Sequence, residues 1–125
     1  MIVRELRSDD INRLKEIHEK FYKEEFELPD FTSGFYGVFA IVDDDKIITI
    51  AGVRPIAESI AITNKDISVR KRREALYKAL EVSSFICNRV GQNQLHIFVQ
   101  KEEWKRQLIR KGFDYCRGEA IYLNV

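Results

Sequence analysis

The sequence is poor in the residues that build cross-linked or metal-bound folds. Only two cysteines occur, Cys87 and Cys116, and they form neither a CxxC pair nor a Cys/His spacing typical of zinc. We therefore expect no disulfide framework, no metal site and a reduced, cytoplasmic setting. No apolar run approaches the roughly 20 residues of a membrane-spanning helix, and the polar start MIVRELRSDD is not typical of a signal peptide. We expect no membrane partner.

The chain also lacks a strong net charge, because 21 Lys and Arg balance 20 Asp and Glu to leave a formal charge of +1. Electrostatic attraction of a partner must therefore be local, and nothing draws the whole chain to nucleic acid. With 125 residues, 45% of them apolar, the chain is long enough to bury a core. We expect one domain spanning residues 1–125, without repeats or linkers.

The first half of the chain carries clear periodic patterns. Ile2–Arg7 alternates apolar and charged residues, which predicts a half-exposed strand. Apolar residues then follow at the spacing of an amphipathic helix: Ile11, Leu14, Ile17 and Phe21. His18 lies beside this stripe, and we interpret it as structural. Two β-branched segments, Gly37–Val42 and Ile47–Val53, predict an antiparallel hairpin with Asp43–Lys46 in the turn.

Between the helix and the hairpin lies an aromatic loop, Glu24–Tyr36, in which Pro29 and Gly34 break any regular structure. Four aromatic residues remain within it: Phe26, Phe31, Phe35 and Tyr36. The loop either folds back on the core or forms one wall of a pocket. Its acidic residues suit a cationic partner and plain solvation equally well.

The second half predicts a strand at Ile56–Thr63, a long helix that ends at Gly91, and a short buried strand at Leu95–Val99. A helix at Glu102–Lys111 and a closing strand at Phe113–Val125 follow, the latter with a turn at Arg117–Gly118. The expected order is β-α-β-β-β-α-β-α-β. This order indicates an α/β (α+β) fold with a mixed, mostly antiparallel central sheet flanked by helices.

The long helix begins with a run of basic residues, Arg70–Arg73. Unpaired backbone N–H groups and the positive end of the helix dipole make such a point a ready anion site. Positive side chains are unfavourable there unless an anion binds or nearby acids, such as Asp66 and Glu74, neutralise them. Both interpretations stay open.

Three segments resemble the GCN5-related N-acetyltransferase (GNAT) family: IVRELRSDDINRLKEI, FAIVDDDKIITIAGVRP and WKRQLIRKGFDY. The resemblance extends over essentially the whole chain. It implies an acyl-CoA-dependent fold that moves an acetyl group from acetyl-CoA to an amine of a small molecule or a protein. In this family the diphosphate of acetyl-CoA is held by a [QR]-x-x-G-x-[GA] loop at the start of the long helix.

That loop has two alignments here, Arg70–Ala75 and Arg72–Tyr77, and we prefer the second because it places Leu76 and Leu80 at positions that the family usually buries. Neither alignment contains a glycine, so side chains would have to replace part of the close backbone contact. The resemblance therefore implies these cofactor-binding residues: Arg70, Arg72, Arg73, Glu74 and Ala75.

For catalysis, the resemblance implies Glu58 as the general base on the strand before the loop. Leu108 stands where many family members have a proton-donating Tyr. Weaker candidates for proton transfer are His96, Tyr115 and Cys116. The main alternative is a catalytically inactive GNAT-fold binding module. Nucleic-acid binding through Arg70–Arg73 is the least favoured interpretation, because stacking aromatics are not interleaved with the basic residues. A homodimer is left open.

Overall fold

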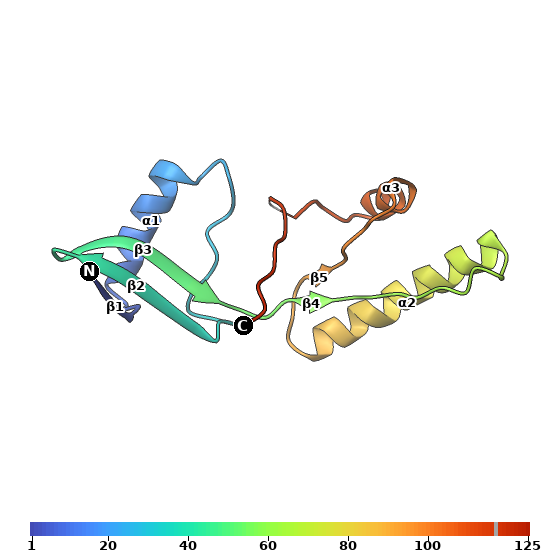
Figure 1. Cartoon of the computed structure of the whole chain (residues 1–125), viewed down its shortest axis with the longest axis horizontal. Helices are drawn as coiled ribbons and strands as arrows, with labels where there is room; N and C mark the ends of the chain where they lie inside the picture. The colour runs from blue at the N-terminus through green and yellow to red at the C-terminus, as the bar shows by residue number, and fades with distance from the viewer. Residues whose placement is uncertain (117) are drawn as a thin grey trace. The chain divides into compact units, whose positions relative to one another are not determined.

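A computed structural model describes residues 1–116 and 118–125 of the chain (Figure 1). Its contacts divide the chain into two compact units. The hairpin unit comprises Met1–Pro55 together with Asp114–Val125, and the crossover unit comprises Ile56–Phe113. The described residues form three helices, a small antiparallel sheet and a parallel strand pair, which is a mixed α+β structure. Among the described residues, no helix combines the length and the apolar character needed to cross a membrane.

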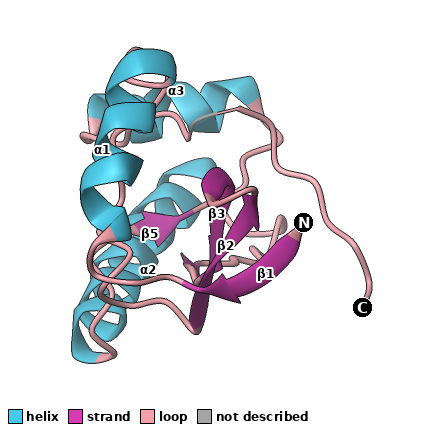
Figure 2. Cartoon of the chain, turned by 90° about the vertical axis from the view of Figure 1, so that its left-hand side faces the viewer, coloured by secondary structure: helices cyan, strands magenta, loops and turns pink. Residues whose placement is uncertain are grey.

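The hairpin unit contains a three-stranded antiparallel sheet in the order β1-β2-β3 (Figure 2). The strands are β1 (Ile2–Glu5), β2 (Gly37–Asp43) and β3 (Lys46–Val53). Asp44 and Asp45 connect β2 to β3 with φ of 46° and 60°. Positive φ at both turn residues matches the right-handed twist of the paired strands. The predicted hairpin and its turn are confirmed.

Helix α1 (Asp10–Phe21) follows β1, as its apolar spacing predicts. Leu14 from this helix is buried, as are Ala40 and Val42 from β2. These side chains form the core of the hairpin unit. His18 has a structural role, because its Nε2 lies 2.6 Å from the Phe26 carbonyl oxygen and ties the aromatic loop to α1.

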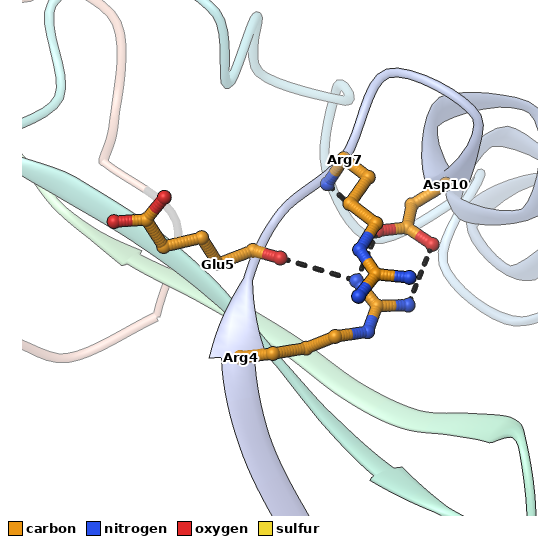
Figure 3. A network of polar contacts seen from close by, with 4 residues as sticks. All are labelled: Arg4, Glu5, Arg7 and Asp10. Atoms are coloured by element: carbon orange, nitrogen blue, oxygen red, sulfur yellow. Dashed lines mark hydrogen bonds and ion pairs between the residues drawn. The ribbon is translucent and has the colours of Figure 1, made fainter.

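An ion pair joins β1 to the start of α1 (Figure 3). Arg4 donates two hydrogen bonds to Asp10, from Nη1 to Oδ2 at 2.6 Å and from Nη2 to Oδ1 at 2.9 Å. The Arg7 backbone N–H donates a third, at 2.8 Å. Asp10 is only 7% exposed, and these bonds, led by those from Arg4, lower its pKa to about 2.

The crossover unit is a parallel strand pair connected through a helix. Strand β4 (Ala57–Glu58) pairs with β5 (Leu95–His96), and α2 (Val69–Arg89) lies between them in the chain. Helix α3 (Glu102–Arg110) follows β5. Gly91 and Gly112, with φ of 79° and 100°, end α2 and α3 where the sequence predicts.

In the second half of the chain, two of the predicted strands are longer than the observed ones, and the prediction of a third strand was wrong. Ladder pairing covers only two residues each of the predicted segments Ile56–Thr63 and Leu95–Val99. The described residues of Phe113–Val125 form no strand, because a β-branched segment becomes a strand only when another backbone pairs with it. The predicted turn at Arg117–Gly118 lies partly outside the described residues.

Candidate functional site at the start of helix α2

The first turn of α2 is capped by Ser68. Its hydroxyl accepts a hydrogen bond from the Lys71 backbone N–H at 3.4 Å, and its carbonyl accepts one from the Arg72 N–H at 3.0 Å. Among the described residues, the amides of Val69 and Arg70 have no acceptor. The open donors at this helix end are therefore these two amides.

The charge at this helix end is unusual for the chain. The first turn of α1 contains Asp10, and that of α3 contains Glu102 and Glu103, but that of α2 contains no acid. Arg70–Arg73 lie there instead. Because the dipole of a helix is positive at its N-terminus, this arrangement favours an anion beside it.

Arg72 differs from the other basic residues because it is half-buried. Its Nε atom is buried and has no hydrogen-bond acceptor among the described residues. A buried donor without an acceptor is costly, and an anion could pair with this nitrogen only if the side chain turned it toward solvent. The exposed side chains of Arg70, Lys71 and Arg73 are the donors that an anion can reach without such a change.

The other predicted cofactor residues lie deeper in α2. Because the helix begins at Val69, the amides of Glu74 and Ala75 fall within the helix, where carbonyls one turn earlier accept them. They have no open backbone N–H to offer a phosphate. Tyr77, the end of the preferred alignment, is engaged with α3. Its ring centroid lies 6.0 Å from that of Trp104, and Lys111 Nζ lies 4.6 Å from it.

Glu58, the predicted general base, is exposed on β4 directly beside His96 of β5. Residues that pair in parallel strands project to the same side of the sheet. His96 is half-buried, and its Nδ1 is buried without a hydrogen-bond acceptor or donor among the described residues. Two of the residues predicted from sequence as proton carriers, Glu58 and His96, are thus adjacent.

The structure separates this pair from the basic turn. The Oγ atoms of Ser59 and Ser83 lie 3.0 Å apart, which fixes the level of β4 along α2. From Val69 to Ser83 a helix rises roughly 20 Å at ~1.5 Å per residue. Figure 1 shows residues 59–68 running beside α2 to reach its N-terminus. Glu58 and Arg70–Arg73 thus belong to two ends of one elongated region.

Leu108 is 2% exposed and belongs to the buried core of the crossover unit. The position at which the resemblance would place a proton-donating Tyr therefore has a packing role here. Tyr115 and Cys116, the weaker candidates, lie in the segment that belongs to the hairpin unit and are both exposed. No three metal-ligating side chains gather anywhere in residues 1–116 and 118–125.

Ser68 was not identified from the sequence, although a Ser directly before a helical pattern is a known capping signal. The pockets of the hairpin unit were only partly anticipated. Phe31 and other residues of the aromatic loop line two pockets there, of about 790 and 470 Å³. The interpretation of this loop as a pocket wall agrees with the structure. Arg54, which lines the smaller pocket, was not identified from the sequence.

Comparisons with known protein families, with curated proteins and with solved structures gave no match for this chain.

Proposed function

We propose that this chain is an acyl-CoA-binding domain of the GNAT type that transfers an acetyl group from acetyl-CoA to an amine of a small molecule or a protein. The observation that carries the proposal is the first turn of α2, which combines the open amides of Val69 and Arg70 with basic side chains and no acid. Acetyl-CoA carries several phosphate charges, and this turn is suited to an anion.

Side chains, more than backbone amides, would bind the diphosphate of acetyl-CoA. Arg70 and Arg73 are exposed, so their guanidinium groups would hold the diphosphate. The basic turn and the level of Glu58 lie roughly 20 Å apart along α2, so the pantetheine arm would have to run beside this helix to bring the thioester to Glu58.

When bound, acetyl-CoA would supply the activated thioester. The chain's own residues would then orient the amine and remove its proton. Glu58 would accept that proton, and His96, which pairs with it across the strands, would be a second candidate base. Orientation of the two reactants accounts for much of the rate in such a reaction. No proton donor at Leu108 is part of this mechanism.

A second candidate is a GNAT-type module that binds a partner without catalysis. Leu108 favours it, since a buried Leu replaces a proton donor. The absence of glycine from Arg70–Tyr77 favours it as well, because bulky side chains restrict the approach of a diphosphate to the backbone.

Titration calorimetry with CoA tests the proposal. We expect saturable binding, and a loss of affinity of about tenfold or more when Arg70 and Arg73 are both changed to Gln, because two charge-assisted contacts are removed. Arg89→Gln, in the last turn of the same helix, is the matched control and should leave affinity unchanged. If the unmodified chain gives no heat with millimolar CoA, the proposal fails.

Thiol release from acetyl-CoA in the presence of a panel of amines separates the two candidates. Release that falls with Glu58→Gln, while CoA affinity is retained, supports the transferase. Saturable CoA binding without release from any amine supports the module.

A further inference from the structure

The smaller pocket of the hairpin unit is open to solvent and has walls that are more apolar than polar. Its volume is about 470 Å³, which is within the usual range for small-molecule sites. One wall comes from the aromatic loop, with Phe26, Phe31 and Phe35. The other comes from the end of β3 and the residue after it, Ala51–Arg54.

The aromatic wall is held in place by contacts within the unit. The rings of Phe31 and Phe35 lie 4.9 Å apart between centroids. Phe35 also rests on the backbone of β3 at Gly52, where an added Cβ would come within 2.8 Å of the ring. At the start of the loop, the Phe26 ring contacts those of His18 and Tyr22. These contacts fix the aromatic wall of the pocket.

One charged group stands at this apolar pocket. The guanidinium carbon of Arg54 lies 5.5 Å from the centroid of Phe35, so the ring positions the cation. Arg54 is exposed and makes no ion pair with any carboxylate among the described residues. Asp30 of the loop is engaged elsewhere, because it accepts hydrogen bonds from the Thr32 N–H and hydroxyl. The donors of Arg54 are therefore available to a ligand.

We propose that this pocket binds a small carboxylate with an apolar body, of the aryl or branched-chain carboxylic acid class. The body would lie among the three Phe side chains, and the carboxylate would accept paired hydrogen bonds from Arg54. A cationic ligand is disfavoured by the charge of Arg54, and a neutral one gains only the apolar contact. The site is separate from the start of α2 and does not depend on the proposed transferase activity.

The test compares phenylacetate with its uncharged analogue, phenylacetamide, by two-dimensional amide NMR and calorimetry on the full chain. We expect phenylacetate to shift the amides of Phe35 and Gly52, and to bind about tenfold or more tighter than the amide, since only the acid pairs with Arg54. Arg54→Gln should reduce this preference to about twofold or less. The preference of Arg54→Lys for the acid should lie between those of the unmodified chain and Arg54→Gln, because Lys keeps the charge but lacks the planar guanidinium group.

Arg13→Gln is the matched control, because Arg13 is an exposed arginine of α1 that lines neither pocket and pairs with Glu16. It should leave both affinities unchanged. Equal affinity for the acid and the amide would overturn the proposal, as would shifts confined to the first turn of α2. Absence of any shift with millimolar phenylacetate would overturn it too.

Discussion

In the hairpin unit, β2 and β3 have seven and eight residues and pair from Gly37–Val53 to Asp43–Lys46 with one register shift, whereas β4 and β5 of the crossover unit pair through two residues each. The connections explain this difference. Two residues, Asp44 and Asp45, join β2 to β3, but residues 59–94 separate β4 from β5. Closing a long connection costs more chain entropy, and a two-residue ladder returns few hydrogen bonds.

The two units consequently rely on different contacts. The hairpin unit has its register, a small core and the Arg4–Asp10 ion pair. In the crossover unit, α2 packs against β5. Tyr77 of α2 also meets Trp104 of α3 and Lys111, the residue after α3. Buried residues of that unit include Cys87 and Leu108. Side-chain packing must therefore stabilise the parallel unit, whereas local strand pairing already stabilises the antiparallel one.

The largest predicted effect is on the core of the crossover unit. Leu108→Ala should destabilise that unit by about 2–5 kcal/mol, the usual cost of emptying a buried Leu site. Amide hydrogen exchange should then accelerate throughout α3 while β2 and β3 keep their protection, and the emission of Trp104, the single tryptophan, should shift.

The neighbouring Ile109→Ala is the matched control for that variant, because Ile109 is 36% exposed. Its effect should be clearly smaller. If Leu108→Ala instead exposes the strands of the hairpin unit to the same extent as α3, the two units unfold together and the contrast between them is lost.

The next effect concerns the hairpin unit in acid. The pKa of Asp10 is about 2, below its ordinary 3.8, so the folded state favours the ionised carboxylate. Its contribution to stability is complete above pH 3.8 and disappears as the pH falls from 3.8 toward 2. On unfolding in this pH window the chain takes up protons, and Asp10→Asn should reduce that uptake by up to about one proton. Denaturant titrations between pH 2 and 5 measure the uptake as the slope of the unfolding free energy against pH.

Asp9→Asn changes the charge of the exposed neighbour and serves as the comparison, since the bonds from Arg4 go to Asp10. It should leave most of the slope in place. A slope that is unchanged in Asp10→Asn would show that the ion pair does not couple proton binding to folding.

The sequence predicts an element well when the element depends on neighbouring residues. It predicts an element poorly when the element depends on residues far apart in the chain. Helix α1, the hairpin and the ends of α2 and α3 depend on periodicity, on a two-residue turn and on Gly91 and Gly112, all of which are local signals. The lengths of β4 and β5 depend on pairing between distant segments. Apolar spacing in Ile56–Thr63 contains no information about where that pairing stops.

The candidate sites divide similarly. The basic start of α2 is visible in the sequence because the residues are consecutive. Arg54 lies 19 residues after Phe35 in the chain, and its place over that ring is set by the register of β3 and by the small size of Gly52. A cation-π contact of this kind has no sequence signal of its own, which is why Arg54 was missed. The adjacency of Glu58 and His96 depends on the β4–β5 register in the same way.

The smallest predicted effect lies at the cap of α2. Ser68→Ala should cost about 0.5–1 kcal/mol, since the bond from the Lys71 N–H to the Ser68 hydroxyl is long at 3.4 Å. Ser68→Asp should have the opposite sign, because it keeps an acceptor and adds a negative charge at a helix end that has none. Thermal unfolding at low ionic strength measures both.

The same two variants report on the anion. An Asp at position 68 would compete with a phosphate for the Arg70 amide and repel it by its negative charge, so CoA affinity should fall in Ser68→Asp although the helix is more stable. Ser68→Ala should change stability with little effect on CoA, because the two open amides stay open. Opposite signs for stability and affinity in Ser68→Asp therefore distinguish an anion site from a helix end that is merely poorly neutralised. If both quantities rise together, the basic turn is a structural defect that an acid repairs, and the phosphate assignment at α2 is wrong.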